Sequence, residues 1–205
     1  GAEDTQNSNP NSPTELQIDG LTGSPIISDF TPEFSAVFTD IDGDNTGNYY
    51  QIQVNTSADF TGTMMWDSSK SAINPAIANG GRSANISYTG NELLSGTTYY
   101  WRIKFWDNET YNNESTWSAI SQFTMNALPI TTSNNISSTS NIYANIPITL
   151  QTIYSDPDGS TDLNRLYLKI HNPSSSTDIE YYISPTGSNQ TEQYPTPVSG
   201  SEYIS

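Results

Sequence analysis

Acidic side chains gather around two tight turns of the sequence. They are Asp40, Asp42 and Asp44 around Gly43 in the first turn, and Asp156, Asp158 and Asp162 around Gly159 in the second. Ca²⁺ takes about six to eight oxygen ligands, and closely spaced Asp side chains on a Gly-containing turn supply several of them locally. The spacing is not that of an EF-hand, because the downstream bidentate Glu is absent. The sequence predicts Ca²⁺ as a cofactor at these turns.

The same turns also have a purely structural explanation. Asp accepts hydrogen bonds from the nearby backbone and Gly adopts positive φ, so both residues are common turn formers. This explanation accounts for each turn by itself, and at this stage both explanations stay open.

The residue types needed for nucleophilic catalysis are scarce. The chain has one histidine, His171, and no cysteine, so few bases could activate a nucleophile. A pair of carboxylates can hydrolyse a glycoside, but the acids of this chain cluster in turns beside Gly. We therefore expect a non-enzymatic chain without catalytic residues.

Aromatic rings are a second kind of candidate site. Strand alternation puts Tyr99, Trp101, Ile103 and Phe105 inward and Tyr100, Arg102, Lys104 and Trp106 outward. We expect most rings to serve core or edge packing. The alternative is an exposed platform of Trp66, Trp106, Trp117 and Tyr111 that stacks on sugar rings, with Trp66 and Trp106 as the ligand-binding residues.

The charge balance excludes two classes of partner. With 6 basic and 22 acidic residues the formal net charge is −16, so the Lys and Arg clusters that neutralise a phosphate backbone are missing. Anionic membrane surfaces are excluded for the same reason, and no apolar run approaches the roughly 20 residues that span a bilayer. We expect no nucleic-acid partner and no membrane insertion in this segment.

The apolar residues form short alternating runs that predict an all-β fold. The candidate strands are 16–18, 34–39, 49–54, 64–66, 84–88, 98–106 and 118–125. We expect a flexible N-terminal linker at 1–12, a β-sandwich at 13–126, a linker at 127–130 that contains Pro129, and a second β-sandwich at 131–205. The fold class is therefore tandem antiparallel β-sandwiches.

An internal repeat supports two modules. The segment from Phe38 to Val54 aligns without a gap on the segment from Tyr154 to Ile170, and alternate positions are apolar in both. The position equivalent to Tyr99 would fall after the last residue of the chain. We expect the second sandwich to be incomplete, with a shorter variant or completion by strands of another chain as the alternatives.

The segment LLSGTTYYWRIKFWDN, which begins at Leu93, resembles the sixth strand of fibronectin type III domains. The residues that carry the pattern are Leu93, Gly96, Thr97, Tyr99, Trp101 and Ile103, whereas Ser95 stands where the family commonly has Pro. The resemblance implies fibronectin type III or immunoglobulin-like modules of microbial surface or secreted proteins. It also implies a tyrosine corner, in which the Tyr99 hydroxyl bonds to the backbone a few residues upstream.

In such a sandwich the loop between the second and third strands shares a pole with the loop between the sixth and seventh. The latter loop carries Asp107, Glu109 and Glu114. Repulsion among acids at one pole is costly unless a cation neutralises it. The turn-former explanation accounts less well for this gathering, so calcium stays open beside it. The predicted metal ligands are the six Asp residues of the two turns together with Asp107 and Glu109.

These features predict an extracellular or cell-surface location. The favoured function is a non-catalytic structural or adhesive module, a spacer or stalk whose partners are neighbouring modules of the same parent protein. The alternative is a carbohydrate- or protein-binding accessory module of a secreted glycoside hydrolase, with a cell-surface glycan or protein as partner. Assembly by strand exchange is a third hypothesis, motivated by the incomplete second module.

Overall fold

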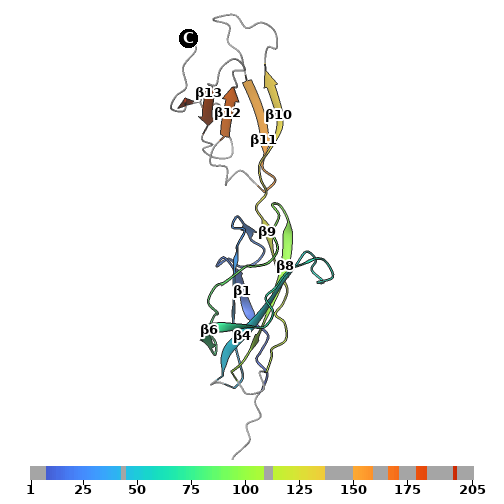
Figure 1. Cartoon of the computed structure of the whole chain (residues 1–205), viewed down its shortest axis with the longest axis vertical. Helices are drawn as coiled ribbons and strands as arrows, with labels where there is room; N and C mark the ends of the chain where they lie inside the picture. Colours follow the sequence, from blue (N-terminus) through green and yellow to red (C-terminus); the bar gives the residue numbers. More distant parts are fainter. Residues whose placement is uncertain are drawn as a thin grey trace, which may run out of the picture. The chain divides into compact units, whose positions relative to one another are not determined.

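The structure is a computed structural model that describes residues 8–42, 45–108, 113–136, 150–158, 166–170, 179–183 and 196–197. All regular elements in these ranges are β-strands, so the predicted all-β class is confirmed. None of these residues belongs to a helix that is long and apolar enough to cross a membrane. The chain divides into two compact units, Gly1–Asn126 and Ala127–Ser205, and Figure 1 shows the strands of each.

The smaller sheet of the first unit has three antiparallel strands in the order β1-β3-β7. They are β1 (Thr14–Ile18), β3 (Glu33–Val37) and β7 (Ile86–Ser87). Phe34, Ala36 and Phe38 are fully buried, as the alternation in the sequence predicts. β7 lies at the edge of this sheet and pairs with β3 alone.

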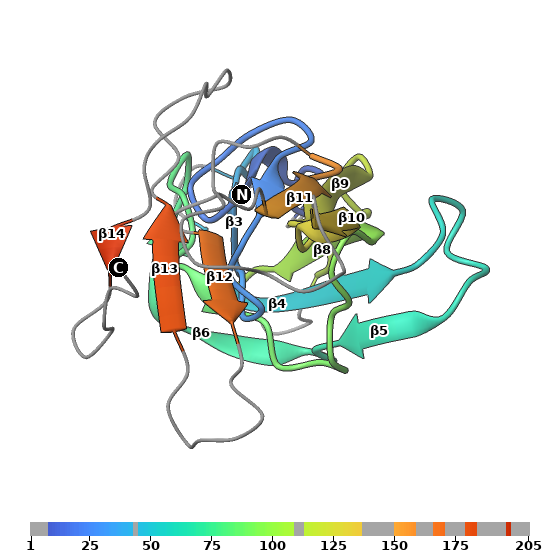
Figure 2. The ribbon, with the colours of Figure 1, turned by 90° about the horizontal axis from the view of Figure 1, so that it is seen from above.

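The larger sheet has six strands and is centred on β8 (Thr98–Trp106) and β4 (Thr46–Asn55). β9 (Ser121–Met125) and β2 (Ile26–Ile27) follow β8 on one side, and β2 pairs with β9 in parallel. On the other side β5 (Met64–Asp67) and β6 (Ser71–Ala78) pair with different halves of β4. Figure 2 shows β5 and β6 along this edge of β4.

The core of the first unit lies between these two sheets and is rich in aromatic rings. The inward side chains of β8 are Tyr99, Trp101, Ile103 and Phe105, none more than 1% exposed, which confirms the predicted alternation. The rings of Phe34 and Trp101 lie 4.7 Å apart between centroids and meet at a tilt of 59°. Tilted and edge-on ring pairs at such distances add to the stabilisation from burial.

The tyrosine corner implied by the sequence resemblance is present. The Tyr99 hydroxyl accepts a hydrogen bond from the backbone N–H of Leu94. All seven predicted strands are found, β8 with the predicted ends and the other six with shifted ends, but the sequence did not predict β2 or β6. β6 contains Pro75, and a Pro inside an apolar run argues against a strand unless the strand lies at a sheet edge, as β6 does.

The second unit contains β10 (Ile130–Ile136), which pairs with β11 (Leu150–Ser155). A separate antiparallel group has the order β12 (Leu166–Ile170), β13 (Ile179–Ile183) and β14 (Thr196–Pro197). In the sequence repeat β11 and β12 take the places of β3 and β4. Whether this module is incomplete stays a prediction.

Candidate functional site

The outer face of the larger sheet carries a row of alternating aromatic rings and cations. Arg102 and Lys104 project outward from β8 because their strand neighbours point into the core. The guanidinium carbon of Arg102 lies 4.1 Å from the ring centroid of Phe60 and 4.4 Å from that of Trp117. The ammonium nitrogen of Lys104 lies 4.9 Å from the Trp117 centroid.

The row continues toward the start of β4. Lys104 also lies 4.7 Å from the ring centroid of Trp106. Lys70 then lies 4.9 Å from the Trp106 centroid and 4.7 Å from the Tyr49 centroid. We call this set the cation–aromatic row; its members in order are Phe60, Arg102, Trp117, Lys104, Trp106, Lys70 and Tyr49.

Polar side chains of the neighbouring strands β4 and β5 fix Arg102. Gln53 lies opposite Arg102 in the β4–β8 pair, and its Oε1 accepts hydrogen bonds from Arg102 Nε at 3.0 Å and Nη2 at 2.7 Å. Asp67 accepts from Gln53 Nε2 at 2.9 Å and from Gln51 Nε2 at 2.7 Å. Burial raises the pKa of Asp67, but hydrogen bonds from Gln51 and Gln53 outweigh it, so its net pKa lies below the usual value.

The loop between β4 and β5 holds the Phe60 ring against Arg102. Phe60 has φ of 59°, and a side chain in this left-handed region costs about 1–2 kcal/mol. Asp59 braces the loop by accepting hydrogen bonds from Ser57 Oγ at 2.6 Å and from Thr61 Oγ1 at 2.7 Å. The bonds from Ser57 and Thr61 lower the pKa of Asp59 to about 2.

The row also concentrates positive charge in an acidic chain. Residues 1–126 contain four basic side chains, Lys70, Arg82, Arg102 and Lys104, and all but Arg82 belong to the row. Lys104 is in turn paired with Glu114 at 3.0 Å. Because each ring of the row already contacts a cation, the arrangement suits a rigid, self-supporting face better than a stacking platform for sugars.

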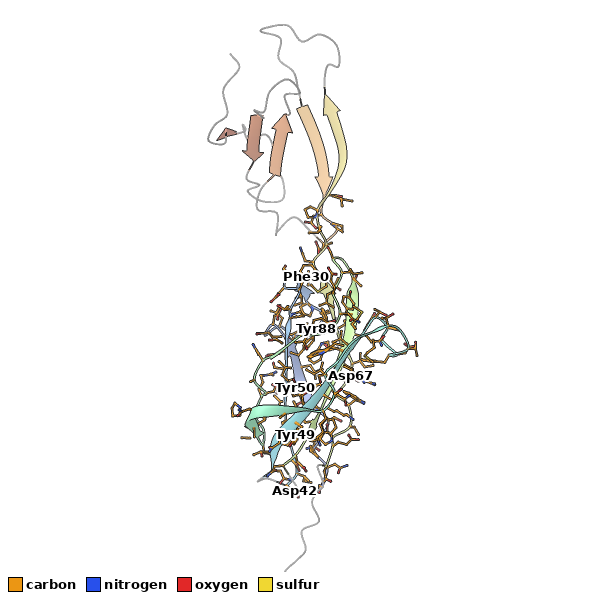
Figure 3. All side chains as sticks on the ribbon, viewed as in Figure 1. Phe30, Asp42, Tyr49, Tyr50, Asp67 and Tyr88 are labelled. Atoms are coloured by element: carbon orange, nitrogen blue, oxygen red, sulfur yellow. The ribbon has the colours of Figure 1, made fainter. Side chains whose placement is uncertain are left out.

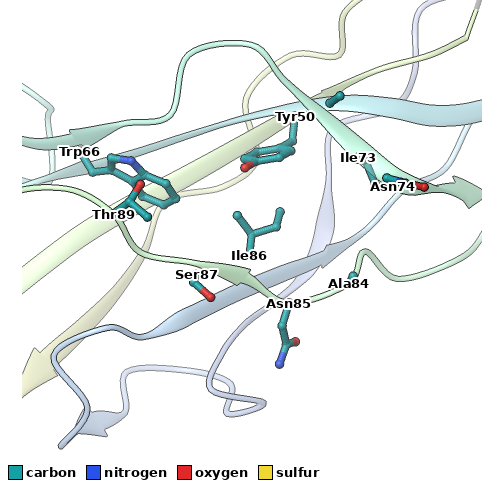
Figure 4. A pocket seen from close by; sticks show the side chains of 10 residues that line it. Tyr50, Trp66, Ile73, Asn74, Ala84, Asn85, Ile86, Ser87 and Thr89 are labelled. Atoms are coloured by element: carbon teal, nitrogen blue, oxygen red, sulfur yellow. The ribbon is translucent and has the colours of Figure 1, made fainter.

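A pocket of about 290 Å³ lies between β6 of the larger sheet and β7 of the smaller sheet. In the larger sheet β6 and β2 lie at opposite edges. Its lining residues are Tyr50, Trp66, Ala72, Ile73, Asn74, Ala84, Asn85, Ile86, Ser87 and Thr89. Figure 4 shows Tyr50 and Ile86 facing one another, while the side chains of Asn85 and Ser87 extend from the other side of β7. We call this cavity the edge pocket.

The burial of Trp66 and Trp106 agrees with the expected core or edge packing and not with the alternative of an exposed sugar-stacking platform, whose Tyr111 lies outside the described residues. Trp66 is only 8% exposed and packs between Phe34 and Tyr88, with ring centroids 5.9 and 5.3 Å away. Trp106 does lie on the outer face, but it is 7% exposed because Lys70 and Lys104 cover its ring. Trp66 nevertheless lines the edge pocket. Sequence reasoning missed Phe60 and Lys70, which come from loops where alternation gives no direction.

The first acidic turn is partly described and is held by hydrogen bonds. Asp40 Oδ1 accepts from the backbone N–H of Asp42 at 2.9 Å, and Asp42 Oδ2 accepts from the N–H of Ser8 at 2.6 Å. Asp42 lies at one end of the first unit (Figure 3). Asn108 Oδ1 accepts from the N–H of Thr46 at 3.1 Å, which brings the two predicted loops together at one pole.

Two of the predicted ligands near this pole cannot be placed. Asp44 and Glu109 lie outside the described residues. Asp107, which follows β8 directly, is 0% exposed. The predicted gathering of acidic side chains around a cation at this pole therefore stays a prediction.

The second acidic turn contacts the first residue of its own unit. Asp158 Oδ2 accepts a hydrogen bond from the N–H of Ala127 at 2.6 Å. The hydrogen bond from the Ala127 backbone, and after it the interaction with the Asp156 side chain, lowers the pKa of Asp158. Asp158 Oδ1 is buried and accepts no hydrogen bond from the part of the chain that the structure describes. Asp162 and His171 lie outside it.

No metal centre is assembled among the described residues, where no group of three or more His, Cys, Asp or Glu side chains could hold an ion. With several of the predicted ligands outside the description, the calcium hypothesis stays a prediction.

The two facing sheets, the buried aromatic core and the tyrosine corner define an immunoglobulin-like β-sandwich module. Residues 13–129 match the family model described as the Rha78A-like, N-terminal immunoglobulin domain. The chain belongs to this family.

The similar curated proteins are much longer than this chain. Two alpha-L-rhamnosidases of Formosa agariphila (strain DSM 15362 / KCTC 12365 / LMG 23005 / KMM 3901 / M-2Alg 35-1) are 35% identical over 82 residues and 28% identical over 102 residues. The aligned segments cover 38% and 49% of this chain but only 8% and 10% of those proteins. The chain thus spans about a tenth of their length.

Among solved structures, alpha-L-rhamnosidase from Dictyoglumus thermophilum is similar over 80% of this chain and 18% of that chain, with 22% identity and a TM-score of 0.49.

Proposed function

We propose that this chain is a non-catalytic accessory module of a secreted glycoside hydrolase that acts on α-L-rhamnosides. The observation that carries the proposal is the match of the N-terminal immunoglobulin domain model to residues 13–129, which span the sandwich from β1 to β9. Both curated relatives are rhamnosidases that this chain matches over a small part of their length. This small coverage supports the proposal that the chemistry belongs to another domain of such an enzyme.

The module supports this enzyme as a rigid unit. Its two facing sheets and its tyrosine corner give an immunoglobulin-like sandwich in which the turn before β8 is tied to the core, and this supports a spacer role beside other domains. The strongly negative charge favours solubility over adhesion to other surfaces. A stalk of a surface protein, which the sequence favoured, ranks second because the similar proteins are hydrolases.

The test is to purify the parent polypeptide with and without residues 13–126 and to measure hydrolysis of an aryl α-L-rhamnoside. We expect activity in the parent, no activity in the isolated 205-residue chain, and an active but less heat-resistant enzyme after the deletion. A parent that cleaves no rhamnoside, or an isolated chain that does, contradicts the proposal.

A further inference from the structure

The edge pocket exists because the two sheets of the first unit end side by side without closing. β7 pairs only with β3, and β6 pairs with β4, so each leaves one edge open toward the gap. Open edges present unpaired backbone donors and acceptors. The bottom of the pocket is formed by Tyr50, Ile73 and Ile86, which pack against the hydrophobic core and remain partly exposed.

The lining of the edge pocket has the chemistry of a neutral, amphipathic ligand. Every lining residue is uncharged, although the chain carries a net charge of −16. A carboxylate, phosphate or amine ligand would find no side chain of opposite charge there. Its volume of about 290 Å³ lies at the small end of the range of ligand pockets, roughly 300–1,000 Å³. The space therefore suits a single ring of monosaccharide size.

Polar side chains of this pocket are available for a ligand. Tyr50 is partly exposed and Asn74 and Thr89 are exposed, so the polar groups of these three side chains are accessible to a ligand in the pocket. They come from β4, β6 and the segment after β7, so they approach the cavity from both sheets. Vicinal sugar hydroxyls both donate and accept, and they match this mixed set.

We propose that the edge pocket binds one ring of a neutral 6-deoxyhexose. The choice of this sugar rests on the proposed function, since α-L-rhamnosides carry such a ring. It also fits the lining, because a C6 methyl group has apolar partners in Ile73 and Ile86. A hexose with a C6 hydroxyl would bring a polar group against these same side chains.

The cation–aromatic row is the competing surface, and its geometry argues against sugar binding there. Stacking needs an accessible ring, but Trp106 is only 7% exposed and lies between Lys70 and Lys104. Arg102 and Lys104 both lie over the Trp117 ring, so a sugar would have to displace them to stack on it.

The test is a titration of the ¹⁵N-labelled chain, observed by NMR, with L-rhamnose and with L-mannose, which differs only by a hydroxyl on C6. We expect saturable shifts at Trp66, Ile73, Ile86 and Thr89 with a Kd of about 1 mM for L-rhamnose. We expect L-mannose to bind at least about tenfold more weakly than L-rhamnose. A factor of ten is the smaller end of the discrimination available to an apolar subsite. Absence of shifts at about 100 mM L-rhamnose, or equal affinity for both sugars, overturns the inference.

Two variants locate the site. Tyr50→Phe and Thr89→Val remove one hydroxyl each while keeping the shape of the side chain, and each should weaken L-rhamnose binding about fivefold or more. Tyr100→Phe is the matched control, because Tyr100 lies on β8 outside the edge pocket. Equal affinity in Tyr50→Phe, Thr89→Val and Tyr100→Phe would place any binding elsewhere and contradict the inference. If either Tyr50→Phe or Thr89→Val loses the NMR spectrum of the native fold, the test rests on the variant that keeps it.

The two proposals fail separately. If the parent cleaves rhamnosides but this chain shows no shifts, the proposed function stands and the edge pocket is only a gap between sheet edges. If this chain binds L-rhamnose but the parent cleaves no rhamnoside, the edge pocket stands and the proposed function fails.

Discussion

The phenolic oxygen of Tyr99 lies 2.9 Å from the backbone nitrogen of Leu94 and accepts its hydrogen bond, which ties the turn before β8 to the core. Tyr99 is 1% exposed, so its ring lies within the core. Tyr99→Phe keeps the ring but leaves the Leu94 N–H without this acceptor. We expect a loss of about 1–3 kcal/mol in the free energy of unfolding.

Urea unfolding followed by tryptophan fluorescence measures this loss for the first unit alone, because all four tryptophans lie in residues 1–126. Tyr100→Phe is the matched control on the outer face of the same strand and should change stability by less than about 0.5 kcal/mol. Equal losses in the two variants would mean that the hydroxyl of Tyr99 has no special role.

The cation–aromatic row predicts energetic coupling between Arg102 and Trp117. The guanidinium group is planar and stacks on the ring, whereas the ammonium group of lysine is compact and lacks the fork that bonds to Gln53. Arg102→Lys should therefore destabilise the first unit although it preserves the charge. In a double-mutant cycle with Trp117→Leu we expect a coupling energy of about 0.5–1 kcal/mol. Additive losses would show that the two side chains contribute independently.

The sequence predicts the parts of this molecule that depend on uninterrupted alternation. β8 was assigned with both ends and both faces because nine residues alternate without Gly or Pro. β6 was missed because Pro75 interrupts it, and an edge strand tolerates a Pro that a central strand does not. Periodicity thus identifies uninterrupted strands and misses an edge strand that contains a Pro.

The candidate sites were predicted only in part for the same reason. Arg102, Lys104 and Trp106 were placed on the outer face, but the contact of Phe60 depends on a positive φ in a loop. The edge pocket depends on where two sheets stop pairing, which residue types do not encode locally. The face of Trp66 was left open because β5 has only four residues, too few for alternation to indicate which face is buried.

The Asp59 loop predicts a change in stability at acidic pH. The folded-state pKa of Asp59 is lowered to about 2 from 3.8, first by the hydrogen bond from Ser57 and then by those from Thr61. Because the pKa is lower in the folded state, the ionised carboxylate stabilises the fold. This contribution is fully present at a pH above the unfolded-state pKa, and it is lost as the pH falls through about 2. We expect the stability difference between the wild type and Asp59→Asn to shrink between about pH 4 and pH 2.

NMR titration of the Asp59 carboxyl carbon checks the cause directly, and urea midpoints of both proteins across this range check the consequence. A carboxyl that titrates at the ordinary value, or a stability difference that does not change with pH, would contradict the bracing role of Asp59.

The calcium hypothesis predicts a melting temperature that depends on the cation. An ion that binds the folded chain selectively stabilises it by RT ln(1 + [L]/Kd), about 2.7 kcal/mol at a hundredfold excess over Kd. We expect melting in millimolar Ca²⁺ to occur at a higher temperature than in chelator, and Mg²⁺ to do far less because it demands a small octahedral site.

Two variants locate the ion. Asp42→Asn should reduce the calcium response of the first turn. Asp158→Asn should reduce the calcium response of the second turn, where Asp158 Oδ1 is buried without a donor from the described residues. Identical melting curves in chelator and calcium would leave the acidic residues with a turn-forming role only.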